Sequence, residues 1–345
     1  MVKILNSKGE PVLLNQREKL VANHLQQKVN SLGYEIDITT LTTIMKRVVE
    51  QKFFEIAPAD YMPIRVGEGA WSSQLLTYRS FALGDDFETG NINTGVSNSK
   101  LAEVDAGVDS VTVKVINWAK TIGWTLFDIQ QALKAGNWDL VASKERSRKK
   151  NWDLGIQKIA FLGSYSDSAV DGLLTQSDVN SNTTLITEYI KGMTAAEFNT
   201  FVQGVFQAYR SNCAQTARPT HFIIPEADYN GLVSFPDATY PLKTKLELLT
   251  EAFKTITGNP NFKILPCSYG DQAINAGSQV ATLGKNRYVL LNYDEDSVRM
   301  DIPVDYTNTL ANSVNSFQFN NVGYGQYTGV KAYRPLEMLY FDWAT

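Results

Sequence analysis

The feature that most constrains this chain is a pair of β-like segments separated by a long polar stretch. Residues 74–81 and 110–118 are rich in β-branched and aromatic residues, and Val111, Val113 and Val115 alternate with polar neighbours. The stretch between them carries six acidic residues against the single cation Lys100, and it also contains four glycines. This pattern predicts a long antiparallel hairpin over residues 71–118 with an acidic tip.

A hairpin of this length is long for a chain of 345 residues. Half of a hairpin of about 45 residues, at about 3.3 Å per residue, would reach about 65–70 Å. A compact chain of this size has a radius of gyration of only about 20 Å. Because a lone two-stranded ribbon is only marginally stable in water, the hairpin needs support. A neighbouring copy of the chain is the simplest candidate, and this predicts self-association.

Local signals predict several helices. Thr125-Leu-Phe-Asp128 fits the pattern of a capping box and predicts a short helix that is broken at Gly136. A longer helix is predicted from about Trp138 or Asp139 to Leu162, because Gly163 follows as a stop signal. Other predicted helices cover residues 15–32, a segment that opens at Thr39 or Thr40, residues 194–209 and residues 245–256.

Short apolar runs bounded by turn residues predict strands in the second half of the chain. They cover residues 221–224, 262–266, 287–293, 299–304, 314–322 and 327–341. The helices and strands follow one another in mixed order rather than in strict alternation. This order favours the α+β class.

The composition limits the classes of function. The net charge is −4, and a protein that grips nucleic acid is normally basic, so a nucleic-acid-binding module is disfavoured. The two cysteines, Cys213 and Cys267, are too few for a disulfide framework and are expected to be buried thiols in a reducing compartment. No stretch of about 18 apolar residues occurs, so no membrane association is expected. The start of the chain is too polar for a signal peptide, which predicts synthesis in the cytoplasm.

A catalytic or metal site has little support in the sequence. The only histidines are His24 and His221, so a metal cluster of the usual His/Cys composition is not expected. No phosphate-binding or nucleophile motif occurs, and no cofactor is expected. A serine hydrolase would have to recruit His221, which is better interpreted as an ordinary half-buried histidine.

One basic cluster stands out in the long predicted helix. It comprises Lys144, Arg146, Arg148, Lys149 and Lys150, tempered by two nearby acidic residues. The favoured interpretation is a face of the helix that is solvated or contacts another subunit. Contact with DNA is the alternative.

Read in order, several segments resemble the major capsid proteins of tailed bacteriophages, which have the Hong Kong 97-type fold. They are Phe54-Glu-Ile-Ala-Pro58 through Val66, Gly69-Ala-Trp71 with Leu76-Thr-Tyr78, Trp118 with Gly123-Trp-Thr125, Asn151 to Gly163, Arg218-Pro-Thr-His-Phe-Ile-Ile-Pro225, Tyr288 to Asp294, and Gly329-Val-Lys-Ala-Tyr-Arg-Pro335 through Asp342. The similarity rests on order and spacing, and it covers nearly the whole chain from about Leu41.

The resemblance implies a domain organisation. Residues 1–65 would form an N-terminal arm, 66–120 the extended loop, and 121–185 a peripheral domain with a long spine helix. Residues 186–315 would form the axial domain, and 316–345 would be strands that return to the peripheral domain. Because the arm begins almost at Met1, any scaffold is expected to be a separate protein.

The resemblance also implies a structural function. The chain would assemble with itself into hexamers and pentamers of an icosahedral virion shell that encloses double-stranded DNA without sequence-specific binding, after synthesis in a bacterial host. A portal, a scaffolding protein and decoration proteins are the further partners implied. Candidates for contacts between subunits are Trp71, Tyr78, Asp85, Asp86, Glu88, Lys100, Arg146, Arg148 and Lys149. The alternatives are an encapsulin-like compartment and, more remotely, a cytoplasmic hydrolase that uses His221.

Overall fold

The structure is a computed structural model, and it divides the chain into Met1–Phe54 and Glu55–Thr345. It describes residues 55–83, 105–136, 139–164, 166–234, 243–276, 283–315 and 317–343. The helices predicted for residues 15–32 and from 39 or 40 onward lie outside the described residues. So does the acidic tip of the hairpin up to residue 104.

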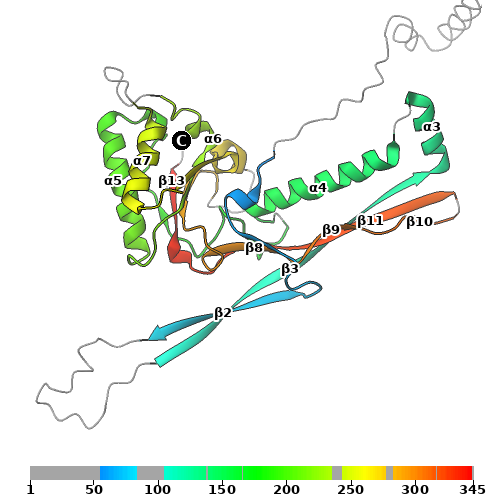
Figure 1. Ribbon diagram of the computed structural model, residues 1–345, viewed down its shortest axis with the longest axis horizontal. Coiled ribbons are helices and arrows are strands. Elements are labelled where there is room, and N and C mark those ends of the chain that lie inside the picture. Colours follow the sequence, from blue (N-terminus) through cyan, green and yellow to red (C-terminus); the bar gives the residue numbers. More distant parts are fainter. Residues whose placement is uncertain are drawn as a thin grey trace, which may run out of the picture. The chain divides into compact units, whose positions relative to one another are not determined.

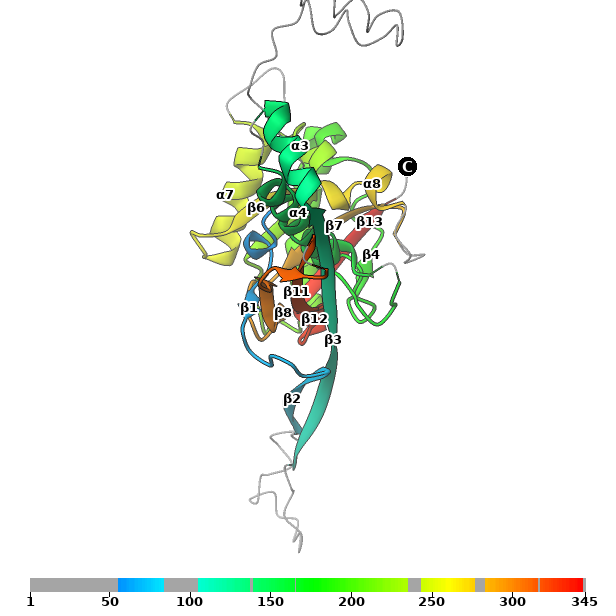
Figure 2. The same ribbon diagram turned by 90° about the vertical axis from the view of Figure 1, so that its right-hand side faces the viewer.

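The predicted hairpin is confirmed, but one of its strands is much longer than expected. β2 (Gln74–Leu83) pairs over all its residues with the first part of β3 (Asp105–Thr125) in antiparallel register. The rest of β3, residues 115–125, pairs with β11 (Gln318–Thr328). Figures 1 and 2 show β3 running from one partner to the other. The prediction of a free ribbon as far as Trp118 is therefore wrong, because only the first half of β3 is two-stranded.

The two helices after the hairpin begin and end where local signals place them. In the box that opens α3 (Leu126–Gly136), the backbone N–H of Asp128 donates to Thr125 Oγ1 and the backbone N–H of Thr125 donates to the Asp128 carboxylate. α4 (Leu140–Leu162) is capped by Asp139, whose Oδ1 accepts from the Ala142 N–H at 3.0 Å. It ends at Gly163, where φ is +76° and a side chain would collide with the backbone carbonyl of Val170.

The remaining elements complete three sheets. In chain order they are η1 (Pro58–Asp60), β1 (Ile64–Val66), β4 (Ser181–Asn182), η3 (Ile190–Gly192), α5 (Ala195–Asn212), β5 (His221–Pro225), α6 (Glu226–Tyr229), α7 (Lys245–Thr257), β6 (Lys263–Cys267), η4 (Ser268–Gly270), α8 (Gln272–Asn275), β7 (Asn286–Leu291), β8 (Val298–Ile302), β9 (Val304–Asn308), β10 (Asn312–Ser313), β12 (Val330–Ala332), η5 (Pro335–Glu337) and β13 (Met338–Trp343). The sheets have the strand orders β1-β8-β12, β10-β11-β3-β2 with β9 also on β11, and β4-β13-β7-β5-β6. The α+β class is confirmed.

The sheet β4-β13-β7-β5-β6 has a hydrophobic core on each face. Along β7, Val289 and Leu291 belong to one core while Tyr288 and Leu290 belong to the other, because successive side chains of a strand point to opposite faces. The first core also contains Trp152 of α4. The second is closed by helices α5 and α7, which Figure 1 shows beside β13. Burial on both faces explains why these strands are apolar without alternation.

The predicted C-terminal segment 316–345 is divided among all three sheets, because β12 lies between β11 and β13 in the chain and pairs with β8. β11 pairs with β3, whereas β13 pairs with β7 in the sheet between the two cores. The strand predicted for residues 314–322 is shifted, since β11 begins at Gln318 and continues to Thr328. Among the described residues, no helix is both long and apolar enough to cross a membrane.

Candidate assembly surfaces

The ribbon formed by β2 and residues 105–114 of β3 is fastened to its own chain along one face. The guanidinium of Arg299 in β8 donates to Thr77 Oγ1 at 3.0 Å, and Arg79 donates to the Tyr333 carbonyl at 3.0 Å. Arg79 also pairs with Asp109 across the ribbon at 2.7 Å. The expectation that only other copies support the ribbon is therefore corrected, because Thr77 and Arg79 anchor it to the β8–β12 region.

The opposite face of the ribbon is contacted at its base, where Lys114 forms an ion pair with Asp167, but it is largely uncovered by the described part of the chain beyond that point. Leu76 and Tyr78 alternate with Thr77 and so point away from the anchored face. Val108 lies on the same side, because it is paired with Ser80. These three side chains, which we call the free face, are 51%, 68% and 68% exposed for Leu76, Tyr78 and Val108. Exposed apolar side chains in a group mark an interaction surface.

Trp71, at the base of the ribbon, is 71% exposed although its backbone is held firmly. Its N–H donates to Gln326 Oε1 at 2.8 Å, and its ring centroid lies 6.0 Å from that of Tyr324. Its φ of +67° is unusual for a bulky residue, and the Gln326 contact helps to fix it. The candidates Asp85, Asp86, Glu88 and Lys100 lie outside the described residues.

The structure places Arg148 inside the chain, so its predicted position on an exposed or inter-subunit face is wrong. It is 4% exposed and lies between α4 and the long sheet. Its guanidinium donates to the Tyr306 hydroxyl at 2.8 Å, to Asn308 Oδ1 at 3.0 Å, and to both the carbonyl and Oδ1 of Asn321. Arginine suits this position because it offers five donors in a fixed fork.

The other members of the basic cluster do not share one surface either. Lys144 donates to the Gly123 carbonyl at 2.8 Å, and Lys150 forms an ion pair with Glu55. Arg146 and Lys149 are exposed. The single basic face expected from the sequence is therefore divided between contacts within the chain and the surface.

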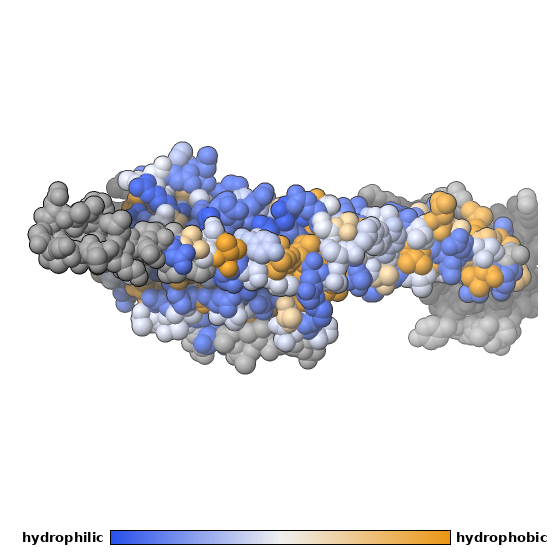
Figure 3. All heavy atoms as spheres, turned by 90° about the horizontal axis from the view of Figure 1, so that it is seen from below, coloured by the Kyte–Doolittle hydropathy of each residue, from blue (hydrophilic) through white to orange (hydrophobic). Residues whose placement is uncertain are grey.

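A second apolar surface, which we call the end patch, lies where α3 meets β10 and the start of β11. The rings of Phe127 and Phe317 meet edge to face with centroids 5.1 Å apart, and the Leu126 N–H donates to the Phe317 carbonyl. Figure 3 shows hydrophobic side chains gathered at this end. The exposed large apolar residues here are Leu126, Phe127, Leu133, Leu310, Val314 and Phe317. The sequence analysis missed this patch because the side chains come from segments far apart in the chain.

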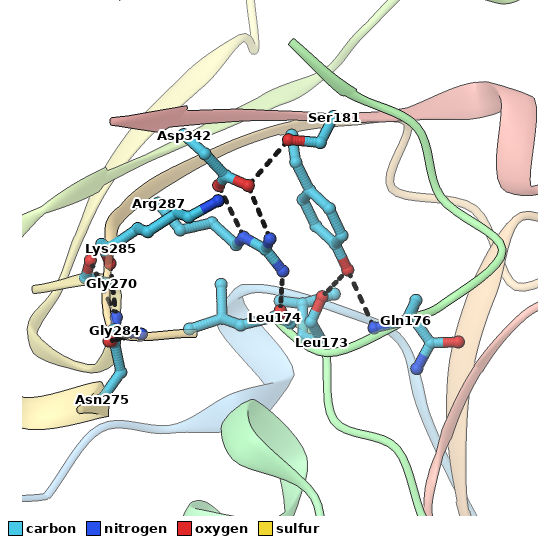
Figure 4. Close-up of polar contacts among 11 residues, drawn as sticks. Leu173, Leu174, Gln176, Ser181, Gly270, Asn275, Gly284, Lys285, Arg287 and Asp342 are labelled. Carbon is cyan, nitrogen blue, oxygen red and sulfur yellow. Dashed lines mark hydrogen bonds and ion pairs between the residues drawn. The ribbon is translucent and has the colours of Figure 1, made fainter. Parts of the chain in front are cut away.

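A buried ion pair ties β13 to β7 between the two cores. Arg287 Nε donates to Asp342 Oδ1 at 2.7 Å and its Nη2 donates to Oδ2 at 2.6 Å. The guanidinium also donates to the Leu174 carbonyl, and Ser181 donates to the same carboxylate, as Figure 4 shows. This network fixes the C-terminal strand, but it offers no site for a reaction since it is closed to solvent.

The surroundings of His221 do not form a catalytic triad in the described structure. Its ring stacks on Tyr293, with centroids 4.8 Å apart, and Nδ1 lies 3.0 Å from Thr220 Oγ1. Nε2 is buried without a hydrogen-bond partner. Among the described residues no group of His, Cys, Asp or Glu side chains is arranged to hold a metal ion. Cys213 and Cys267 are buried free thiols, as predicted.

The burial of His221 makes a testable prediction about pH. Burial, with a smaller contribution from the charge of Lys263, lowers the pKa of His221 from 6.5 to about 4. The unfolded chain therefore binds a proton as the pH falls below 6.5, while the folded chain does not until about pH 4. Between pH 7 and 4, this group should remove roughly 3 kcal/mol of the free energy of unfolding. Urea unfolding at several pH values measures the loss.

The control for this prediction is the His221→Phe variant, which keeps a ring against Tyr293. Other groups also titrate in this range, so the difference between the two proteins isolates the histidine. The stability of the variant should fall less steeply with decreasing pH than that of the wild-type chain. Identical pH profiles would show that His221 does not contribute.

Comparison with solved structures identifies the fold. The chain resembles the capsid of Myoviridae phage XM1, with a TM-score of 0.72 at 13% identity, covering 88% of this chain and 97% of that one. It also resembles a structure from Mycobacterium phage Ogopogo, with a TM-score of 0.56 at 11% identity and coverage of 89% and 98%. A virus-like particle from Pyrococcus furiosus gives a TM-score of 0.50 at 10% identity, with coverage of 95% and 100%. At such identities the likeness establishes the Hong Kong 97-type fold alone.

Sequence comparisons then bear on the family. A search of curated proteins gave no match. The family model described as "Major capsid protein" matches residues 92–343, which is more than two thirds of the chain. The matched region includes β3, most of both hydrophobic cores and the end patch. This protein therefore belongs to the major capsid protein family and has the fold of tailed-phage capsid subunits.

Proposed function

We propose that this chain assembles into hexamers and pentamers that close into an icosahedral shell around double-stranded DNA. The observation that carries the proposal is the pair of uncovered apolar surfaces, the free face of the ribbon and the end patch. Burying such surfaces against identical copies supplies free energy, and closed symmetry lets each subunit satisfy several contacts at once. The mild net negative charge would keep the inner wall from holding DNA, so that release stays easy.

The finer parts of the proposal follow from the resemblance to capsid proteins. The boundaries are an arm at 1–65, an extended loop at 66–120, a peripheral domain at 121–185, an axial domain at 186–315 and returning strands at 316–345. Inter-subunit contacts involve Trp71, Tyr78, Asp85, Asp86, Glu88, Lys100, Arg146 and Lys149. Assembly takes place in the bacterial host with a portal, a scaffolding protein and possible decoration proteins as partners, and the finished chain resides in the virion.

Electron microscopy of the purified protein tests the proposal directly. Isometric shells are expected, and particles made during infection should contain nuclease-protected DNA. A cargo protein in place of DNA would instead favour the encapsulin-like alternative, which the likeness to the Pyrococcus furiosus particle makes worth testing. A stable monomer under assembly conditions would contradict the proposal.

The end patch gives a sharper prediction. Phe127 is 67% exposed, so the Phe127→Asp variant should fold with a free energy of unfolding within about 1 kcal/mol of the wild-type value. Its yield of shells should fall at least about tenfold, because a charge would be buried without a partner at the contact. Sedimentation and electron microscopy measure the yield.

The matched control is Gln130→Asp, which adds the same charge at an exposed polar position of the same helix. It should assemble nearly as well as the wild-type chain. Equal shell yields from all three proteins would show that the end patch is not a contact between subunits.

The hydrolase alternative makes a different prediction for His221. Under the structural proposal, His221→Ala leaves assembly intact apart from its effect on stability. A specific loss of a hydrolytic activity in this variant would favour the enzyme. The family and the fold are those of structural proteins.

A further inference from the structure

The ribbon joins the body of the chain at a junction within β3. Residues 105–114 of β3 pair with β2 and residues 115–125 pair with β11, as Figure 1 shows, so among the described strands only β3 runs through both parts. β2 has ten residues, which is about 30 Å of ribbon. A rotation of about 10° at the junction would therefore move the far end of β2 by about 5 Å. The direction of the ribbon depends on what holds this junction.

The segment 67–73, which we call the connector, leads from β1 to β2 and folds tightly. Gly67, Gly69 and Trp71 all have positive φ, at +93°, +76° and +67°. Glycine suits the first two positions because it has no side chain to clash in this conformation. Tryptophan does not suit the third, since a bulky side chain makes the left-handed backbone costly. Such a conformation persists only where surrounding contacts enforce it, and it is a signal of function.

The contacts that enforce it come from β11 and β3. The Trp71 N–H donates to Gln326 Oε1 at 2.8 Å, and Gln326 Nε2 donates to Asn117 Oδ1 at 2.6 Å. Gln326 and Asn117 are direct partners on the two strands. The Trp71 ring lies against Tyr324, with the ring centroids 6.0 Å apart. Trp71 is thereby fixed to the part of the sheet that does not belong to the ribbon.

A few residues later the connector enters the ribbon. The Val115 N–H donates to the Ser73 carbonyl at 3.0 Å, at the residue where β3 changes its partner. Gln74, the first residue of β2, follows directly. The connector therefore crosses the junction, with Trp71 bound to the body on one side and β2 on the other.

Trp71 adds little to the stability of the folded subunit. Its side chain is 71% exposed, so it buries little apolar surface. One tilted aromatic contact is worth about as much as the left-handed backbone costs. A glycine at this position would keep the N–H bond to Gln326 without strain. The tryptophan is therefore explained by the position that it imposes on the chain rather than by stability.

We propose that Trp71 is a positioning residue that braces the junction and fixes the direction of the ribbon in the unassembled subunit. The ring contact with Tyr324 and the bond to Gln326 resist rotation of the ribbon about β3. The anchors at Thr77 and Arg79 hold the ribbon further out. A ribbon that is set in advance loses less conformational freedom on association. This inference rests on the proposed function, since it states how the subunit is prepared for assembly.

The distance between two nitroxide labels on the unassembled subunit tests the brace. The labels are attached to Ser80→Cys in the ribbon and Lys149→Cys on α4, two exposed positions. Ser80 pairs with Val108, and about 40 Å of β3 separates Val108 from Lys120. Because Lys120 donates to Asn151 of α4, the labels should lie at about that distance, which double electron–electron resonance measures. The wild-type background should give one narrow distribution of distances.

Trp71→Gly is the decisive variant, because glycine adopts the same backbone and keeps its N–H. Its distribution should be at least about twice as wide as that of the wild-type background, while the urea midpoint stays nearly unchanged. Tyr324→Ser should widen the distribution as much, and the double variant no further, since all three lack the same contact. Trp71→Asn, which also tolerates the left-handed backbone, replaces Trp71→Gly should that variant fold poorly. The native Cys213 and Cys267 are buried and should take no label.

The matched control is Tyr78→Ser. Tyr78 is 68% exposed, close to the value for Trp71, but it lies within the ribbon beyond the junction. Its distribution should stay as narrow as that of the wild-type background. Trp71→Gly should also slow the appearance of shells, followed by light scattering, at least about fivefold, because more freedom of the ribbon is lost on association.

The outcomes separate this inference from the proposed function. A broad distribution in the wild-type background, or one in Tyr78→Ser as broad as in Trp71→Gly, overturns the brace. A narrow distribution in Trp71→Gly also overturns it, and if assembly is lost at the same time, Trp71 acts only as a contact between subunits. If the wild-type chain has a fixed ribbon but forms no shells, the brace stands and the proposed function is contradicted.

Discussion

Asp342→Asn is expected to lower the free energy of unfolding by roughly 3–5 kcal/mol. The Arg287 and Asp342 side chains are 5% and 3% exposed, and two parallel hydrogen bonds join them. Asparagine keeps the size of the aspartate but removes its charge. The guanidinium then stays buried against a neutral partner, and this uncompensated charge is the source of the loss. Urea unfolding of unassembled subunits, followed by tryptophan fluorescence, measures the change.

Two controls test whether burial is the cause. Asp178→Asn breaks the pair between Asp178 and Lys331, in which the aspartate is 53% exposed, and should cost less than about 1 kcal/mol. The double variant Arg287→Met with Asp342→Leu removes both charges together and should be more stable than either single variant, since no unpaired charge remains. If Asp342→Asn lowers the free energy of unfolding by no more than Asp178→Asn does, the buried ion pair does not stabilise the packing of β13 against β7.

The helices could be predicted from the sequence because their signals are local. Thr125 and Asp128 mark one helix start, and Thr194 and Glu197 another, where the structure shows a complete capping box. Such a box satisfies the free N–H groups of the first turn by contacts three residues apart. The end of α4 at Gly163 follows equally from a local requirement for positive φ.

The strand partners could not be predicted, because pairing depends on residues far apart in the chain. Residues 115–125 carry the same alternation as the ribbon, and nothing local shows that their partner is β11 rather than β2. The separation of β11 from β13 into two sheets is a non-local outcome of the same kind. The hairpin itself could be predicted because its two strands are close in sequence.

The candidate surfaces, too, include parts that could be predicted from the sequence and parts that could not. Trp71 and Tyr78 are exposed, and their proposed role in contacts between subunits stays a prediction. The end patch was missed, since it combines side chains from distant segments. Arg148 was misplaced because charge alone suggests an exposed position, whereas Tyr306 and Asn308, which accept hydrogen bonds from it, are more than 150 positions away in the chain.

Arg148→Met is the second change with a large expected effect. Methionine fills much of the same volume but donates no hydrogen bond. The carbonyl and side-chain oxygens of Asn321 would lose their donor in a buried setting, and Tyr306 and Asn308 would lose theirs in a partly buried one. Because each buried acceptor left without a partner costs about 1–3 kcal/mol, the free energy of unfolding should fall by roughly 3–5 kcal/mol. Urea unfolding of the unassembled subunit measures the loss.

This substitution also shows whether Arg148 makes its contacts within one subunit or between two subunits. If the residue fastened one subunit to another, the variant subunit would unfold like the wild-type chain and fail only to assemble. If it fastens α4 to β9 and β11 within the chain, the subunit itself is weakened and shells form only at lower temperature. Arg146→Met, at an exposed position of the same helix, is the matched control and should leave the urea midpoint nearly unchanged. An unaltered midpoint in Arg148→Met would contradict the buried network and return Arg148 to the candidates for contact between subunits.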